Sequence, residues 1–383
     1  MALVEKRWLN LSVRILLSAG LLFCIYLVTR RAIALWYFRD PTPDRVRQAI
    51  RFDPGNPTYY VALAGLIQYS SEGSDLDQVV RLYETATRLS PHQANYWAKL
   101  AGVYELAGRT EDAQRGFERA RQLFPNSPDV NWQLANFYLR IGKTREALPA
   151  LQKVLLGDPA LRRQTFDLSW RATEDAGLIL AEMIPPNGEI LFQYLSYLIE
   201  KQRIDEAAQV WARILELGLR FEPQAAFPYL DALVQHQRVD QLTEAWAALA
   251  ERNPTQIRQR RFTTDVITNG DFEAEILNGG LDWRASPVEG IVVSIDSLTF
   301  FDGTRSLAIR FDGKHNLDYG HVYKHIPVKA NTFYRFVGYM RVKGITTDSG
   351  PRFQIYDPYD PAKLFLSTEN LVGTASWSPQ QLE

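Results

Sequence analysis

The sequence predicts a multidomain protein with three structural parts: an amino-terminal transmembrane helix, an all-α array of repeated helix pairs, and a carboxy-terminal all-β sandwich. Three observations lead to this fold class. An uncharged stretch near the amino terminus is flanked by basic residues, a set of small and aromatic residues recurs through the middle, and short alternating runs separated by turn residues follow. At 383 residues the chain is also too long for one compact core.

The predicted organisation has four segments. Residues 1–39 form a cytoplasmic amino terminus and membrane anchor, residues 40–254 the helical repeats, residues 255–262 a linker, and residues 263–383 the sandwich. The linker carries three arginines, which we interpret as a solvated charge run.

Composition excludes several classes of partner. The net charge is −1, with 43 Lys and Arg against 44 Asp and Glu, so no overall field attracts nucleic acid. Cys24 is the single cysteine, which excludes an internal disulfide and a zinc site built on several thiolates. We therefore expect no nucleic-acid partner.

The amino terminus predicts a membrane anchor. The stretch Ile15 to Thr29 has no charged residue, but as a helix it rises only ~22 Å against a hydrocarbon core of ~30 Å. The span is therefore expected to begin near Leu9, with Trp8 and Trp36 at the two interfaces. A cleaved signal peptide and a buried helix of a soluble domain are the alternatives.

Charge flanking the span is nearly balanced, so it sets the orientation only weakly. We choose an inside amino terminus, because the long remainder then follows as an exported body. This predicts a single-pass membrane protein with the bulk of the chain extracytoplasmic, in the periplasm or at the cell surface.

The middle of the chain repeats itself at a period of thirty-four residues. The first copy of the pattern comprises Leu100, Ala101, Tyr104, Gly108, Ala113, Phe117, Ala120 and Pro125. The second copy comprises Leu134, Ala135, Tyr138, Gly142, Ala147, Leu151, Val154 and Pro159. Small residues recur where two helices cross, and proline closes each second helix, so each copy predicts one helix pair.

This pattern resembles tetratricopeptide repeats, with two strong and three weaker copies between residues 44 and 254. The resemblance implies a scaffold that binds a protein partner on the outward positions of each unit's first helix. The candidate residues of this groove are Tyr69, Asn95, Glu105, Asp129, Trp132, Asn136 and Arg140. Packing of the aromatic candidates on a neighbouring helix is the alternative interpretation.

From residue 263 short alternating runs replace the helical periodicity, which predicts a β-sandwich. Asn269-Gly270-Asp271-Phe272-Glu273, then Trp283, then Phe301-Asp302-Gly303-Thr304, resemble the galactose-binding-like jelly roll of carbohydrate-binding modules. In such modules a final pair of strands follows a run like Gly373 to Trp377. We therefore interpret the sequence as truncated at its carboxy terminus.

Sugar binding by this lobe would need exposed aromatic rings beside amides and carboxylates, and Gln354 is one of the polar candidates. The glycan-binding candidates are Tyr319, Tyr323, Tyr356, Tyr359 and Trp377. Some of these rings are expected in the core instead.

Three acidic residues are candidate ligands of a structural calcium ion, as the resemblance implies: Glu273, Asp302 and Asp312. Oxygen ligands from separate loops are what calcium takes in proteins. The alternative is that Asp302-Gly303 and Asp312-Gly313 are simple turns. No other cofactor is expected.

No nucleophile elbow, phosphate loop, dinucleotide fingerprint or paired metal motif is found, so the chain is expected not to be an enzyme. The predicted function is a membrane-anchored scaffold that binds a protein through its repeats and a glycan through its sandwich. By resemblance, this function lies in polysaccharide assembly or export. The alternatives are a purely protein-binding scaffold, and the non-catalytic part of a longer extracytoplasmic enzyme.

Overall fold

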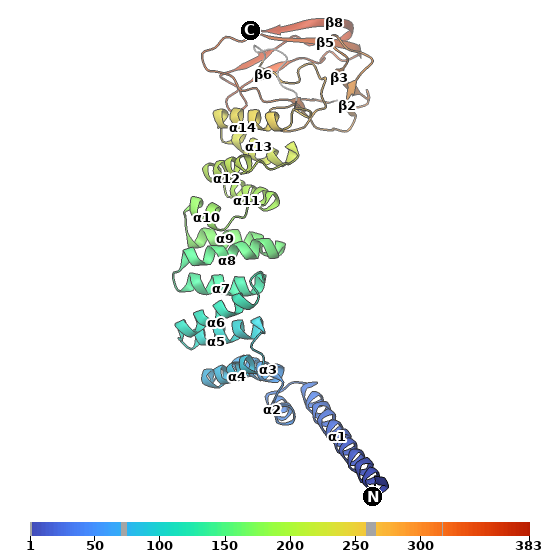
Figure 1. Ribbon diagram of the computed structural model, residues 1–383. Helices are drawn as coiled ribbons and strands as arrows, with labels where there is room; N and C mark the ends of the chain where they lie inside the picture. The colour runs from blue at the N-terminus through green and yellow to red at the C-terminus, as the bar shows by residue number, and fades with distance from the viewer. Residues whose placement is uncertain (1, 70–74, 258–265, 316) are drawn as a thin grey trace. The chain divides into compact units, whose positions relative to one another are not determined.

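The computed structural model describes residues 2–69, 75–257, 266–315 and 317–383, with side chains from residue 14 onward. These residues form fourteen α-helices and eight β-strands (Figure 1). The chain divides into two compact units, residues 1–197 and 198–383. This division falls inside α11 (Gly188–Glu200) and does not coincide with the predicted linker, of which residues 258–262 lie outside the described part. The predicted domain limits remain a prediction.

The first helix, α1 (Ala2–Phe38), is long, and its last turns belong to a packed core. Ala34 is fully buried and shares a hydrophobic cluster with α2 (Pro43–Phe52) and α3 (Pro57–Gln68). The Phe38 ring lies 4.9 Å from that of Tyr59, and the Tyr37 ring lies 5.9 Å from that of Phe52. The end of α1 is thus the partner helix of α2.

Helix pairs follow in unit 1 (Figure 1). They are α3 with α4 (Leu76–Leu89), α5 (Ala94–Leu106) with α6 (Thr110–Leu123), and α7 (Pro128–Arg140) with α8 (Thr144–Gly157). The short helices α9 (Arg162–Ala172) and α10 (Ala176–Glu182) complete this unit before α11.

The repeated small residues have the packing role that their spacing predicts. A Cβ atom on Gly116 would lie 2.8 Å from the Cβ of Ala101, so α5 and α6 cross too closely for larger residues there. Gly108 and Gly142 have φ of 73° and 75° in the tight turns between paired helices, a backbone region that favours glycine. The thirty-four-residue pattern is thus a pattern of helix crossings.

Unit 2 begins with helices and ends with strands. Its helices after α11 are α12 (Ile204–Glu216), α13 (Phe227–Gln235) and α14 (Val239–Arg252). The strands are β1 (Arg284–Ala285), β2 (Ile291–Asp296), β3 (Ser306–Phe311), β4 (Val322–Tyr323), β5 (Phe336–Ile345), β6 (Gln354–Tyr356), β7 (Phe365–Ser367) and β8 (Gly373–Leu382).

The strands pair two by two, and all four pairs are antiparallel: β1 with β4, β2 with β3, β5 with β8, and β6 with β7. Over the described residues these pairs do not join into the two larger sheets of a jelly roll. The expectation of a strand-rich carboxy-terminal region is confirmed, whereas a jelly-roll sandwich is not shown. The buried apolar side chains of residues 266–315 and 317–383 are Leu281, Ile291 and Val342, too few for a sandwich core.

Within unit 2 the strand-rich region packs against α13 and α14 through two glycines. A Cβ atom on Gly279 would lie 2.1 Å from the Phe227 ring, and one on Gly280 would lie 2.4 Å from the Trp246 ring. Nearby, the Arg284 guanidinium pairs with the Asp231 carboxylate, and the Arg284 Nη1 donates to the Gly280 carbonyl at 3.0 Å. The loop backbone at Gly279 and Gly280 therefore lies directly against side chains of α13 and α14.

Candidate functional site

The outward face of α3, α5 and α7 is the candidate protein-binding surface. A Cβ atom on Gly65 or Gly102 would meet no atom within 4 Å, so the surface above these two helices is open. Two apolar side chains border it, with Tyr69 84% exposed and Leu106 61% exposed. A surface with free space above the helix backbone and exposed apolar side chains at its border can bind another chain.

Two of the predicted groove residues contact each other. The Arg140 Nε and Nη2 atoms donate to the Glu105 carboxylate at 2.5 and 2.8 Å, which joins α7 to α5. The Glu105 carboxylate holds the pKa of the Arg140 guanidinium above its usual range through these hydrogen bonds. This fork fixes the position of both side chains and leaves part of the guanidinium accessible.

The other five groove candidates do not form one cluster. Asn136 Nδ2 donates to the backbone carbonyl of Trp132 at 2.8 Å, one turn earlier in α7, and both residues are half-buried. Tyr69, Asn95 and Asp129 are exposed, each on a different helix or helix end. Asn95 and Asp129 lie in the first turns of α5 and α7, where they are open to a partner.

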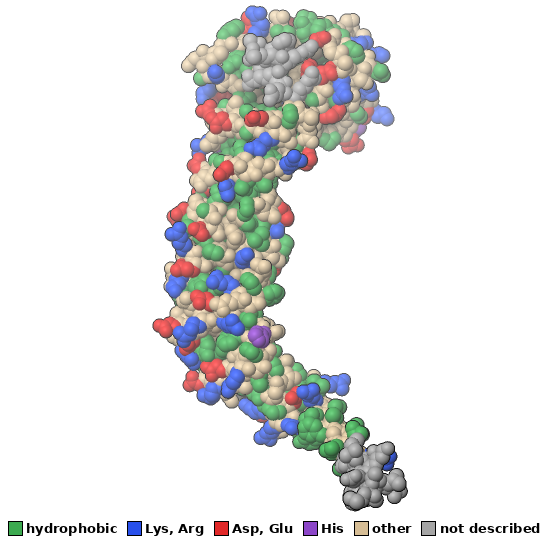
Figure 2. All heavy atoms as spheres, viewed as in Figure 1, with side chains coloured by type: hydrophobic (Ala, Val, Ile, Leu, Met, Phe, Trp, Pro, Cys, Tyr) green, Lys and Arg blue, Asp and Glu red, His purple; other side chains and the backbone are tan. Residues whose placement is uncertain are grey.

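Charges on the repeats are mixed in sign. On the face that Figure 2 shows, basic and acidic side chains alternate over the helices. Several are paired locally, such as Arg109 with Asp112 and Arg203 with Glu206. A mixed surface does not concentrate the positive potential that nucleic acid requires.

α1 contains one segment, Arg14–Phe38, that is long and apolar enough to cross a membrane. The large apolar side chains from Ile15 to Val28 are exposed, for example Leu16 at 71% and Leu22 at 66%, whereas Ala34, Tyr37 and Phe38 at the end of the segment pack in the first core cluster. Figure 2 shows hydrophobic side chains on the visible part of this helix.

The five predicted glycan-binding aromatics lie on separate elements: Tyr323, Tyr356 and Trp377 are on β4, β6 and β8, and Tyr319 and Tyr359 are in loops. Tyr319 donates from its hydroxyl to the Ser286 carbonyl at 3.1 Å, and Tyr359 donates to the Val234 carbonyl of α13. The exposed Tyr323 ring lies under the Arg284 guanidinium at 5.8 Å. Trp377 is half-buried beside Phe301, with ring centroids 6.1 Å apart.

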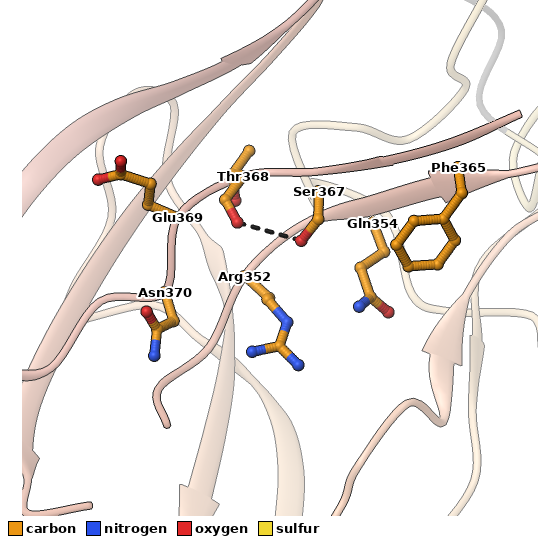
Figure 3. Close-up of a pocket in the computed structure, with 7 residues that line it drawn as sticks. All are labelled: Arg352, Gln354, Phe365, Ser367, Thr368, Glu369 and Asn370. Atoms are coloured by element: carbon orange, nitrogen blue, oxygen red, sulfur yellow. Dashed lines mark hydrogen bonds between the residues drawn. The ribbon is translucent and has the colours of Figure 1, made fainter. Parts of the chain in front are cut away.

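Tyr356 is the candidate with the most open surroundings, because it lies beside a hollow. Its ring is 50% exposed and lies 6.3 Å from the ring of Phe365, its partner in the β6–β7 pair. The hollow next to it has a volume of about 610 Å³ (Figure 3). Its lining residues are Arg352, Gln354, Phe365, Ser367, Thr368, Glu369 and Asn370.

Of these seven lining residues, the sequence predicted Gln354 as a polar partner for a sugar, and the other six were not predicted. The signal that could have found them is the alternation Gln354-x-Tyr356 and Phe365-x-Ser367, which places one face of each strand together once the strands pair.

The three predicted calcium ligands all accept hydrogen bonds within the structure, and Asp302 Oδ1 accepts one from the Gly303 backbone N–H at 2.9 Å. The Glu273 carboxylate accepts a hydrogen bond from the Arg305 backbone N–H at 3.0 Å and further ones from the backbone and hydroxyl of Thr304. Asp312 accepts from the Lys314 backbone N–H at 2.9 Å, and with His315 this lowers the pKa of its carboxyl. Over the part of the chain that the structure describes, no three His, Cys, Asp or Glu residues gather as a metal site would require. Calcium stays a prediction.

Two half-buried basic groups, Lys324 and His325, lie in the same region. Lys324 Nζ donates to the Thr268 backbone carbonyl and lies 5.3 Å from the Trp283 ring, and burial lowers the pKa of its ammonium to about 8. Burial, with Arg284 nearby, also lowers the pKa of His325.

Comparison with known proteins identifies the repeats. A family model described as tetratricopeptide repeat matches residues 106–164, which include α6, α7 and α8. Residues 106–164 therefore match the tetratricopeptide-repeat pattern. The match covers this part of the chain and leaves the strand-rich region unassigned.

Curated relatives match over alignments of 91 to 115 residues. The TPR repeat-containing protein YpiA of Bacillus subtilis (strain 168) is 30% identical over 115 residues, which are 30% of this chain and 26% of that protein. The peroxisomal targeting signal receptor of Saccharomyces cerevisiae is 31% identical over 91 residues, or 24% of this chain and 14% of that one. The chain thus matches about a quarter of YpiA and less of the receptor.

The human protein O-mannosyl-transferase TMTC1 is 28% identical over 102 residues, or 25% of this chain and 11% of that protein. Among solved structures, a MamA structure is 16% identical with a TM-score of 0.34, and it covers 50% of this chain and 91% of its own. YrrB, described as a TPR protein with an unusual peptide-binding site, is 18% identical with a TM-score of 0.29, and covers 56% and 95%.

Proposed function

We propose that this protein is a non-catalytic, membrane-anchored scaffold that binds a segment of a protein partner across the face of α3, α5 and α7. Tetratricopeptide repeats supply the general function, which is protein interaction. The observation that carries the specific site is the open surface over Gly65 and Gly102, bordered by Tyr69 and Leu106. The extracytoplasmic location and the absence of catalysis belong to the same proposal.

The chemistry of this face favours a peptide segment with alternating apolar and polar side chains. Tyr69 and Leu106 offer apolar contacts, while the Arg140–Glu105 fork offers a charged group already held in position. The name of the yeast relative describes a receptor for a targeting signal, which is consistent with a peptide partner here.

The test of this face is a substitution that fills the free space above α5. The substitution Gly102→Arg places a long side chain where a Cβ atom has free space, so folding is expected to be unchanged while partner binding is lost. The matched control is Gln122→Arg on α6, the second helix of the same repeat, where the side chain is exposed. Partners crosslinked to the wild type in cells and kept by Gln122→Arg, but lost by Gly102→Arg, support the proposed face. Equal retention by both variants contradicts it.

The anchoring part rests on the exposed apolar side chains of α1. A cut after Ala34 would remove Ala34 from the first core cluster and leave Tyr37 and Phe38, which also pack there, beside a new chain end, which disfavours a cleaved signal peptide. Deletion of residues 2–29 keeps these packed turns and removes most of the apolar segment. The truncated chain is expected to move to the soluble fraction, and its retention in membranes would contradict anchoring.

A second candidate function, glycan binding by the strand-rich region, is favoured by the exposed Tyr356 and Phe365 rings beside the hollow. With the anchor, it would suit a role in polysaccharide assembly or export. Affinity electrophoresis of the full chain in polysaccharide gels tests this function. Unretarded migration in every gel would leave the repeats as the single binding part.

A further inference from the structure

We propose that the hollow beside β6 and β7 binds a saccharide residue that carries a carboxylate, with Arg352 as the group that recognises the charge. This inference rests on the glycan-binding function and specifies its site and ligand class. The volume of about 610 Å³ lies within the range of roughly 300–1,000 Å³ of small-ligand sites.

The base of the hollow is held by the backbone. Leu371 N donates to the Pro351 carbonyl at 3.1 Å, and Thr368 N donates to the Phe353 carbonyl at 3.0 Å, which extends the β6–β7 ladder beyond the strands. At the crossing, a Cβ atom on Gly350 would lie 1.7 Å from the Leu371 carbonyl oxygen, so only glycine fits there. The lining side chains therefore start from fixed backbone positions.

The register of the strand pair gives the hollow an aromatic side. Tyr356 pairs with Phe365 and Gln354 pairs with Ser367, so these four side chains lie on one face of the pair. Phe365 is 56% exposed, and its ring is open to a ligand. The apolar face of a pyranose ring can stack on such an aromatic ring.

The polar side chains supply hydrogen bonds in the same space. Figure 3 shows Arg352, Gln354 and Asn370 reaching in one direction, with Phe365 beside Gln354 and Glu369 turned away from Arg352. Asn370 Nδ2 donates to the Asp348 carbonyl at 3.0 Å, which orients the amide and leaves its oxygen free to accept from a hydroxyl.

The ligand class follows from the guanidinium. Within the described residues Arg352 has no ion pair or hydrogen bond, and Glu369 lies beyond ion-pair distance although both line the hollow. A guanidinium presents a planar fork of donors that matches a carboxylate bidentately. A sugar acid could place its ring on Phe365 and its carboxylate toward Arg352. Its hydroxyls could then bond to the amides of Gln354 and Asn370, so all three kinds of lining group, aromatic, guanidinium and amide, would contact the ligand.

The test uses the detergent-solubilised full chain and two probes, an oligogalacturonate and an uncharged galacto-oligosaccharide of the same length, with binding measured by calorimetry. The wild type is expected to bind the oligogalacturonate, with affinity that falls as salt rises. Arg352→Gln should weaken this binding roughly tenfold to a hundredfold, because a charge-assisted hydrogen-bond pair is lost. Phe365→Ala should also weaken it.

The matched control is Arg341→Gln, which removes the same charge from an exposed position on β5 outside the hollow and should leave binding unchanged. If Arg341→Gln and Arg352→Gln weaken binding equally, the attraction is a general surface charge and the proposed site is wrong. Equal binding of the two probes overturns the acidic ligand class. Binding that survives both hollow variants overturns the site while glycan binding stands. No binding of either probe by the wild type overturns the proposed site and ligand class, and the polysaccharide gels then decide whether the chain binds any glycan.

Discussion

The α5–α8 repeats and the strand-rich region of residues 266–383 are held together in different ways. In the repeats, Leu134, Ala135 and Leu151 are fully buried, and small residues set the distance between helices. In the strand-rich region few apolar side chains are buried, and specific contacts such as the Glu273 hydrogen bonds to residues 304–305 hold the loops. A repeated apolar register specifies the first region, whereas individual glycines and polar groups specify the second.

The largest expected effect is in the repeat core. Phe117 is 2% exposed, and its ring lies 5.2 Å from that of Phe137 in the next repeat. Phe117→Ala should lower the free energy of unfolding by about 3–5 kcal/mol, through lost burial and the cavity left behind. Urea denaturation followed by circular dichroism measures this change. Leu106→Ala, at a 61% exposed position, is the control and should change stability little.

The next largest loss of stability is expected at Gly280, where a single glycine lets the strand-rich region pack on α13 and α14. Gly280 has φ of 57° and approaches the Trp246 ring, so Gly280→Ala should cost about 2–4 kcal/mol from backbone strain and overpacking. Thermal unfolding monitored by tryptophan fluorescence measures it.

Gly313→Ala separates the two causes of the Gly280→Ala effect. Gly313 has a similar φ of 70°, but a Cβ atom there would meet nothing within 4 Å. It should cost the backbone strain alone, so equal losses for the two variants would show that close packing at Gly280 has no role.

A smaller effect is the pH dependence of stability that the half-buried Lys324 introduces. Its pKa of about 8 in the folded protein lies below the ordinary 10.5, so between these values the unfolded chain binds more protons than the folded one. The free energy of unfolding should therefore rise from pH 8 to pH 10. Lys324→Met should remove this rise, while the exposed Lys343→Met should keep it. A rise that persists in Lys324→Met would assign it to another group.

The smallest effect is the coupling between Glu105 and Arg140. Their fork is partly exposed, so a double-mutant cycle with Glu105→Gln and Arg140→Gln should give about 0.2–1 kcal/mol, reduced at high salt. A coupling of zero at low salt would mean that the fork does not position these side chains.

The contrast between the repeats and the strand-rich region also explains what the sequence could predict. The repeats were predictable because residues such as Ala101, Gly108 and Phe117 depend on crossings within a fixed period. The role of Ala34 and Phe38 in the first core was not, since these residues continue an already apolar helix and no change of period marks them. The jelly roll was inferred from motif resemblance, but strand pairing is non-local and alternation alone does not fix which strands join.

The hollow was missed for the same reason. Arg352 and Phe365 are separated in sequence and come together only through the β6–β7 register and the crossing at Gly350. Among the predicted groove residues, Glu105 and Arg140 do meet, because both positions follow from the repeat period.

The most direct test of the scaffold function places a photo-crosslinking amino acid at Gly102 in the full chain in cells, with Gln122 as the control position. Both positions accept a larger side chain, since the space above Gly102 is open and Gln122 is exposed. The account predicts a discrete protein adduct from position 102 and none from position 122. Adducts of equal yield from both positions, or adducts from position 122 alone, would contradict partner binding on the face of α3, α5 and α7.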